Sequence, residues 1–457
     1  MFFSKKKTKE NVKETRGYLY SSRDLKKLIG PLVVEQYMAI TIGMLDTMMV
    51  SVVSESAVSG VSLVDAIFIL LINVFTALGT GGAVIAGRYL GQKKPEQGCE
   101  VVDQLVIFTA VASVAIMALL YACKYFVLNV VFGAIDAEVE YNCNVYLMIT
   151  SASIPFIACY NSCAALFRAM NDSKTPMKIS ILMNAVHIIG NAVLLYVFRM
   201  GVEGVAVPTL FSRVLAALCM LLLLKNQKNE LHFSEHFQFR LKKDVLKSIL
   251  YIGIPNSLEN SMFQLGKILV LSFVSGMGTY AITANAIGNA MNAMAVVPGI
   301  SMGFALLAVV SQCVGAGDYE QVKYYTKKIM KWEYGVIIAT NICIISLLPV
   351  IMKLYHASSM TADAATKIMI MHAVMACLIW PISFTLPNTL RASGDVIFTM
   401  AAAIVSMWVF RVICARVIGV TMGVGVIGVW IAMFIDWIFR SMCFTVRYKK
   451  GKWKTKA

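Results

Sequence analysis

The sequence predicts an all-α polytopic membrane protein with twelve transmembrane helices in two six-helix lobes. Of its 457 residues, 58% are hydrophobic and only 14% are charged, whereas a soluble domain carries about 25% charged residues. The mean hydropathy is +0.72, and apolar stretches of about 20 residues, long enough to cross a hydrocarbon core of about 30 Å, recur along the chain. Landmarks of the first half also recur in the second half, which indicates a duplicated architecture.

The apolar stretches define six expected helices in each half. In the first half they cover 28–52, 61–86, 101–123, 143–167, 177–198 and 203–224. In the second half they cover 247–275, 281–310, 331–352, 367–388, 397–418 and 424–446. The polar stretch 226–246 is then a cytoplasmic linker between a first lobe at 28–225 and a second lobe at 247–446. The remaining segments are an N-terminal tail at 1–27 and a basic C-terminal tail at 447–457.

Four short motifs recur in the same order in the two halves. They pair PLVVE with PNSLE, GQKKPEQ with GAGDYEQ, RAMND with RASGD, and GVEGV with GVIGV. Each half has an even number of helices, so both copies share one orientation and a pseudo-two-fold axis along the membrane normal relates them. The first motif brings Pro31 and Glu35 into register with Pro255 and Glu259, 224 residues later. Because these four are duplicated, we expect them to serve the lobe hinge or gate.

The basic residues predict the orientation of the chain. Most of the 41 Lys and Arg residues lie in the two tails and in alternate loops, while the opposite loops hold Lys124, Arg199, Lys353 and Lys367, with Arg416 at a helix end. The positive-inside rule therefore places both termini in the cytoplasm of a multi-pass protein of the cell membrane. The net charge of +16 then indicates contact with anionic membrane lipids, not with nucleic acid.

Asp46 is the clearest ionisable residue inside a predicted helix, where a charge costs about 2.5–3.5 kcal/mol. The residue 224 positions later is Val270, so the acid belongs to one half only. A structural role shared by the two halves predicts an equivalent acid in both. The asymmetry favours a function in coupling over a structural ion pair or hydrogen-bond hub.

Polar residues of two later helices are candidate partners of Asp46. Asn184, His187 and Asn191 share one helix face, and Thr209 lies in the next helix. The oxygens of Asp46, Asn184, Asn191 and Thr209 could bind Na⁺, which prefers oxygen ligands as other hard cations do. Alternatively Asp46 carries a proton, with His187 as a second titratable group. Hydrogen bonding between helices is the structural alternative for the asparagines and the threonine.

The second half has its own polar residues inside predicted helices. Asn260, Gln264 and Lys267 share one face of the helix at 247–275. Asn285, Asn289 and Asn292 share a face of the next helix, while Arg411 and Asp436 lie in the last two helices. These residues could line a substrate cavity, or they could form a structural network in which a cation such as Lys267 or Arg411 pairs with an acid.

Enzymatic motifs are missing from the sequence. It contains no GxSxG, no HExxH and no phosphate-binding loop, so we expect neither an enzyme nor a cofactor beyond a coupling ion, H⁺ or Na⁺. Most of the 11 cysteines lie in predicted helices without a CxxC pair, which is typical of packing residues.

Several stretches resemble the multidrug and toxic compound extrusion (MATE) family over nearly all of positions 25–447. They are GMLDTMMV, AGRYLGQKKPEQ, LFRAMNDSKTPM, GVEGVAVPT, GIPNSLEN, VVSQCVGAGDYEQ and LRASGDV. The resemblance implies a secondary active efflux antiporter whose two lobes alternate access. It also implies that entry of H⁺ or Na⁺ drives export of amphipathic, often cationic, drugs or metabolites.

The resemblance also implies roles for individual residues. Asp46 and Thr209 match a first-helix acid and a sixth-helix threonine of the family's coupling-cation site. His187 stands where the family often has Asn, and Asn191 where it often has Asp, which leaves one acid in the cluster. Because 367–388 contains no Asp or Glu, the tenth-helix acid of another branch is missing, and the site is expected in the first lobe.

Two other function classes compete with drug export. A flippase for lipid-linked saccharides, from a related superfamily, often has a strongly cationic central cavity, whereas few Lys or Arg lie within the predicted helices here. A membrane-embedded enzyme would need a catalytic histidine with acidic partners, and neither His187 nor His372 lies in such a motif. We therefore expect a functional monomer that binds small-molecule substrates and membrane lipids.

Overall fold

The structure of the protein is a computed structural model that describes residues 17–133, 135–234 and 239–455. Parts of the predicted tails and of the predicted linker lie outside these ranges. Within the described residues the chain is helical, with short connections and no β-strand. The all-α class predicted from the sequence is therefore confirmed.

The first lobe contains six helical spans in chain order. They are α2 (Ser22–Val50), α3 (Glu55–Gly91), α4 (Pro95–Ala122), the pair α6 (Ala137–Ser151) and α7 (Ile154–Ala169), α8 (Lys174–Ala192) with its continuation η2 (Val193–Val197), and α9 (Glu203–Leu224). Between α4 and α6 lie the short α5 (Lys124–Phe126) and η1 (Val127–Val131). The α6–α7 pair is bent by 49°.

The second lobe repeats this order. Its spans are α10 (Lys243–Ser275), α11 (Thr279–Gly315), α12 (Tyr319–Leu354), α13 (Ser359–Trp380) continued by η3 (Pro381–Thr385) and α14 (Leu386–Ala392), α15 (Val396–Val405) continued by η4 (Ser406–Ile413) and η5 (Ala415–Thr421), and α16 (Val426–Lys449). A short 3₁₀ helix, η6 (Lys452–Thr455), follows.

The twelve expected spans thus have twelve helical counterparts, although they differ in polarity. Among the described residues ten helices are long and apolar enough to cross a membrane, and the bent α6–α7 pair adds an eleventh. The twelfth, α10, contains Asn256, Asn260, Gln264 and Lys267, which lower its hydropathy. Several helices also outrun the apolar stretches: α3 spans Glu55–Gly91 where 61–86 was expected, because helical hydrogen bonding continues where the sequence turns polar.

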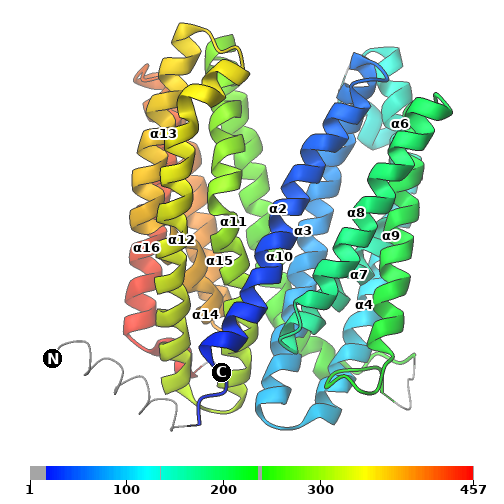
Figure 1. Cartoon of the computed structure of the whole chain (residues 1–457), viewed down its shortest axis with the longest axis vertical. Helices are drawn as coiled ribbons and strands as arrows, with labels where there is room; N and C mark the ends of the chain where they lie inside the picture. The colour runs from blue at the N-terminus through cyan, green and yellow to red at the C-terminus, as the bar shows by residue number, and fades with distance from the viewer. Residues whose placement is uncertain (1–16, 134, 235–238, 456–457) are drawn as a thin grey trace.

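The two lobes form two helical bundles that stand apart at one end and converge at the other, where the described chain begins (Figure 1). α2 leans from the second bundle at its start towards the first bundle at its end, and it packs on both α11 and α8. Between the lobes, α3 packs against α10 and α11.

Two duplicated glycines allow α3 and α11 to approach closely at the converging end. A Cβ atom at Gly91, the last residue of α3, would lie 2.0 Å from the Gln312 carbonyl oxygen of α11. A Cβ atom at Gly315, the last residue of α11, would lie 2.0 Å from the Arg88 carbonyl oxygen of α3. Only glycine permits backbones to approach this closely, so both copies of the motif require it.

Two different side chains at equivalent positions reinforce this contact with hydrogen bonds across the lobes. Arg88 of the first lobe donates from Nη2 to the Ala392 carbonyl oxygen at 2.9 Å. Gln312, 224 residues later, donates from Nε2 to the Ala169 carbonyl oxygen at 2.6 Å. The Tyr20 hydroxyl, ahead of α2, also contacts Gln312. The converging end is therefore closed by a pair of equivalent contacts.

Candidate functional site

Three helices of the first lobe bring Asp46 together with three of its four predicted partners. Asn191 of α8 donates from Nδ2 to Asp46 Oδ1 at 2.8 Å, and His187, one turn earlier, places Nε2 3.6 Å from the same oxygen. Thr209 of α9 places its hydroxyl 3.0 Å from His187 Nε2. The Asp46 side chain is 19% exposed and that of His187 is 12% exposed. Asp46 and His187 are thus half-buried, while Asn191 and Thr209 are buried.

The fourth predicted partner, Asn184, does not contact Asp46. Its Nδ2 donates to the Ser180 hydroxyl at 3.3 Å, one turn earlier in α8. In Asn191, the oxygen Oδ1 is buried and has no hydrogen-bond partner among the described atoms. The structure therefore assembles Asp46, His187, Asn191 and Thr209, and it leaves Asn184 outside the cluster.

A second acid lies close to Asp46, which corrects the expectation of a single acid. Asp65 of α3 accepts a hydrogen bond from the Tyr146 hydroxyl at 3.2 Å, and its carboxylate is near enough to that of Asp46 for mutual repulsion. The guanidinium of the half-buried Arg213 in α9 attracts both carboxylates and donates from Nη1 to the Ser153 hydroxyl at 2.8 Å. Because Asp65 and Arg213 are ionisable residues inside predicted helices, they could have been noticed in the sequence.

The residues expected at a hinge or gate form equivalent ion pairs in the two lobes. Glu35 of α2 accepts from Arg168 of α7 at 2.7 Å, and Glu259 of α10 accepts from Arg391 of α14 at 2.6 Å. Pro31 and Pro255 lie inside α2 and α10, one turn before these glutamates. Each pair joins helices of one lobe, so it holds a lobe together and does not bridge the two.

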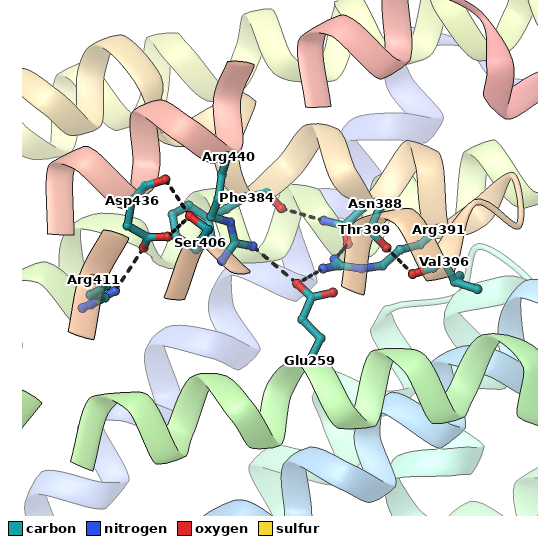
Figure 2. A network of polar contacts seen from close by, with 10 residues as sticks. All are labelled: Glu259, Phe384, Asn388, Arg391, Val396, Thr399, Ser406, Arg411, Asp436 and Arg440. Atoms are coloured by element: carbon teal, nitrogen blue, oxygen red, sulfur yellow. Dashed lines mark hydrogen bonds and ion pairs between the residues drawn. The ribbon is translucent and has the colours of Figure 1, made fainter. Parts of the chain in front are cut away.

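The second lobe adds further charges to its pair (Figure 2). Arg440 of α16 also approaches Glu259 Oε1, at 3.4 Å. Arg411 of η4 places Nη1 3.7 Å from Oδ2 of Asp436, whose other carboxylate oxygen is held by the Ser406 hydroxyl. These contacts form a buried network of three arginines and two acids.

A cavity of about 770 Å³ lies between the lobes. Its wall includes all five residues predicted to line a substrate cavity, namely Asn260, Gln264, Lys267, Asn285 and Asn289, and it also includes Asn292. Two of the asparagines have protein partners as well: Asn285 Oδ1 accepts from Trp430 Nε1 at 3.1 Å, and Asn292 Oδ1 lies 2.7 Å from His372 Nε2. The two alternatives for this polar set, cavity wall and structural network, thus coexist.

The charge of the cavity wall differs from the sequence-based expectation of few cationic side chains. Arg391, Arg411 and Arg440 line the cavity together with Lys267, and Glu259 is the one acid among the described lining residues. Lys267, Arg411 and Arg440 lie within predicted helices. Arg391 lies three residues beyond the helix expected at 367–388. The apolar stretch ends there because a polar turn follows, although the helix itself continues to Ala392.

Another buried acid was also missed. Glu333 of α12 is fully buried and accepts a hydrogen bond from the Thr385 hydroxyl at 2.7 Å. Among the described residues no three His, Cys, Asp or Glu side chains gather as metal ligands. Any cation at Asp46 would therefore depend on amide, hydroxyl or water oxygens.

Duplicated helical lobes with a cavity between them are typical of many membrane transport proteins. Comparison with known proteins identifies the family. The MatE family model matches residues 31–193 and 255–417, once in each lobe. The chain belongs to this family, the MATE multidrug efflux transporters.

Similar proteins cover nearly the full chain. The "Uncharacterized transporter YisQ" of Bacillus subtilis is 25% identical over 436 residues, 94% of each chain. The "Probable multidrug resistance protein NorM" of Thermotoga maritima is 25% identical over 464 residues, 98% of this chain and 95% of that one. A solved outward-facing structure of a multidrug resistance MATE family transporter superposes with a TM-score of 0.85 at 18% identity, over 94% of this chain and 96% of that chain.

Proposed function

We propose that this protein is a secondary active efflux antiporter that exports small amphipathic molecules in exchange for a cation entering at Asp46. The observation that carries the proposal is the half-buried cluster of Asp46, His187 and Asn191. The equivalent position in the second lobe is Val270, so this acid is no part of the duplicated scaffold. An ionisable group at membrane depth is a functional candidate by default.

The contacts favour H⁺ over Na⁺ as the coupling ion. A sodium site needs converging oxygens, whereas Asn191 offers Asp46 its amide nitrogen and Asn184 bonds to Ser180. The imidazole of His187, 3.6 Å from the carboxylate, supplies a second group that titrates near neutral pH in its unperturbed state. Proton transfer between these two groups is the simplest chemistry of the cluster.

Alternating access follows from the arrangement of the lobes. The closed end, with Gly91 and Gly315 in backbone contact, lies on the side where the described chain begins, which we assign to the cytoplasm of a cell membrane. The lobes at 28–225 and 247–446 then rock as units, joined by the linker at 226–246. Substrate leaves the cavity on the opposite side and the cation enters there.

The driving force is sufficient for export. One positive charge that enters down about 100 mV releases about 2.3 kcal/mol. At about 1.4 kcal/mol per factor of ten, this energy sustains a gradient on the order of fifty-fold for an uncharged exchange partner.

Transport by the purified protein in liposomes tests the proposal. Proton and sodium gradients are imposed separately, and export of fluorescent amphipathic dyes of both charges is followed. We expect the proton gradient to drive export and Asp46→Asn to abolish it. Asp363→Asn is the matched control, because Asp363 is an exposed acid paired with Lys367. Unimpaired proton-driven export by Asp46→Asn contradicts the proposal.

A further inference from the structure

The wall of the central cavity carries an excess of positive charge. Among the described lining residues, Lys267, Arg391, Arg411 and Arg440 are cationic, and Glu259 alone is acidic. At membrane depth such side chains face a water-filled cavity or mark a substrate pathway. The excess therefore bears on which molecules the cavity accepts.

Glu259 cannot neutralise its neighbours fully. Its Oε1 accepts from Arg391 at 2.6 Å and from Arg440 at 3.4 Å, so one carboxylate serves two guanidinium groups (Figure 2). The Nε atoms of both arginines are buried without a hydrogen-bond partner among the described atoms. Donors of both arginines remain for an additional acceptor.

The positive charges of Arg411 and Lys267 are neutralised even less by nearby acids. The Nη1 atom of Arg411 is 3.7 Å from Asp436 Oδ2, beyond hydrogen-bond length, and its Nε also lacks a partner among the described atoms. Lys267 is exposed and lies over the Phe263 ring with its Nζ 5.8 Å from the centroid. Within the described residues no acid lies within ion-pair distance of Lys267. These two cations stand on neighbouring helices without adequate counter-charges.

The duplication separates scaffold cations from the others. The Arg391–Glu259 pair has its counterpart in Arg168–Glu35, so it belongs to the architecture of both lobes. The residues 224 positions before the other three cations are neutral or titratable: Gly43 for Lys267, His187 for Arg411 and Ala216 for Arg440. The three extra cations therefore have no cationic arginine or lysine counterpart at the equivalent positions of the first lobe, and they line the cavity.

Aromatic side chains complete the cavity wall. The rings of Trp380 and Phe384 stack at 5.0 Å, and the Arg440 guanidinium lies 4.6 Å from the Phe384 ring centroid. Stacking of this kind holds a guanidinium flat and leaves its N–H groups free to bind an oxyanion. The volume of about 770 Å³ falls in the range of about 300–1,000 Å³ for small-molecule sites.

We propose that the central cavity binds an amphipathic organic anion, with its carboxylate or phosphate at Arg411, Lys267 and Arg440 and its apolar body against the aromatic wall. The inference deepens the proposed export function and names the charge of the exported substrate. It replaces the expectation of cationic substrates, because a cation would meet repulsion at this wall. Guanidinium groups bind carboxylate and phosphate with two parallel hydrogen bonds, which makes such anions the best partners.

A pair of probes with the same ring and opposite charge tests the proposal. Binding of 1-naphthaleneacetate and of 1-naphthaleneethylamine to the full protein in phosphatidylcholine nanodiscs is measured by isothermal titration calorimetry. We expect the acetate to bind at least about tenfold more tightly, since one added ion pair readily exceeds the free energy of a tenfold change. Equal or tighter binding of the amine overturns the proposal.

Two variants locate the anion. We expect Lys267→Gln to weaken acetate binding about tenfold, and this variant leaves no acid unpaired, so its fold is preserved. Arg411→Gln is the second variant, with the same expectation. Lys327→Gln is the matched control, because Lys327 is exposed on α12 and does not line the cavity. Acetate binding of wild-type strength in both cavity variants overturns the proposal.

A lipid arm identifies the source of the anion. When the nanodiscs contain phosphatidic acid, loss of acetate binding assigns the cavity to a lipid-borne phosphate, as a flippase would require. Unchanged binding assigns it to a soluble anion. Either result supports an anionic substrate.

The outcomes also separate this inference from the antiport proposal, because binding needs no gradient. Acetate binding without any gradient-driven transport defeats antiport and leaves the anion site standing. Proton-driven export of the amine but not of the acetate defeats the anion site and leaves antiport standing.

Discussion

The two lobes share a scaffold and differ in the charged side chains that they carry elsewhere. Both contain the glutamate–arginine pair, at 2.7 Å in the first lobe and 2.6 Å in the second. Both contribute one glycine to the closed end. Away from these positions the first lobe holds the neighbouring, half-buried acids Asp46 and Asp65, while the second lobe lines the cavity with cations.

This difference indicates a division of tasks. Duplicated residues hold each lobe together and close one end, whereas the residues that diverged include those that we propose to bind the coupling cation and the substrate. The acid cluster of the first lobe lies outside the wall of the central cavity, so a cation and an anionic substrate would occupy separate places. Coupling between them then travels through the movement of the lobes and not through direct competition.

The largest expected effect on proton-driven export comes from placing a fixed positive charge of the second lobe at the equivalent position of the first lobe. His187 and Arg411 are 224 residues apart, so His187→Arg gives the first lobe the arginine that the second lobe has at the equivalent position. The Nε2 atom of His187 lies 3.6 Å from Asp46 Oδ1, and an arginine at this position stays charged and keeps the carboxylate ionised, so we expect proton-driven export to fall to the level of Asp46→Asn. Export from proteoliposomes measures this loss.

The control for this substitution is His187→Gln, which removes the titratable ring without adding a fixed charge. It should retain a substantial part of the proton-driven export. Wild-type export by His187→Arg would show that Asp46 need not change its protonation state.

A second comparison concerns the stability of the two duplicated ion pairs. Glu259→Gln leaves two buried arginines without their acid, so we expect it to lower the free energy of unfolding by about 3–5 kcal/mol. Glu35→Gln removes the acid of Arg168 alone, and the Arg168 guanidinium also lies 5.0 Å from the Phe304 ring centroid. We therefore expect Glu35→Gln to lower the free energy of unfolding by about 2 kcal/mol. Thermal unfolding of the purified variants in detergent measures both. Equal losses would mean that Arg440 adds nothing to the pair.

The contact between α3 and α11 at the closed end should weaken to the same extent when either of its two glycines is replaced by alanine. A methyl group at Gly91 or at Gly315 would meet a backbone carbonyl oxygen at 2.0 Å, so each alanine variant must separate α3 from α11. We expect each to cost about 1–3 kcal/mol of this closed contact. Hydrogen exchange should then rise at the ends of α3 and α11. Gly335→Ala is the control, since no atom lies within 4 Å of its added Cβ.

An alanine variant whose exchange at these helix ends matches that of Gly335→Ala would contradict the symmetric closure. A large increase for one glycine only would indicate that the two lobes contribute unequally to closing this end.

The fold was largely predictable because the apolar stretches and the duplicated motifs can both be recognised in the sequence. The site was predictable only in part. His187 and Asn191 share a helix face by spacing alone, but the approach of Asp65 to Asp46 depends on how α3 packs beside α2, which spacing does not define. The cavity charge was underestimated because the apolar stretch ends at residue 388, whereas the helix α14 that carries Arg391 continues to Ala392.

The smallest expected effects on stability and export come from substituting two asparagines of α8, Asn184 and Asn191. The sequence could not distinguish their roles. Asn191 donates to a carboxylate at 2.8 Å, so Asn191→Ala should cost about 2 kcal/mol of stability and impair coupling. Asn184 donates only to Ser180 at 3.3 Å, so Asn184→Ala should cost about 0.5 kcal/mol and leave proton-driven export unchanged. Thermal unfolding and proteoliposome export measure both. If Asn184→Ala abolishes export as Asp46→Asn does, a four-oxygen sodium site forms during transport and the first lobe takes up Na⁺ in place of H⁺.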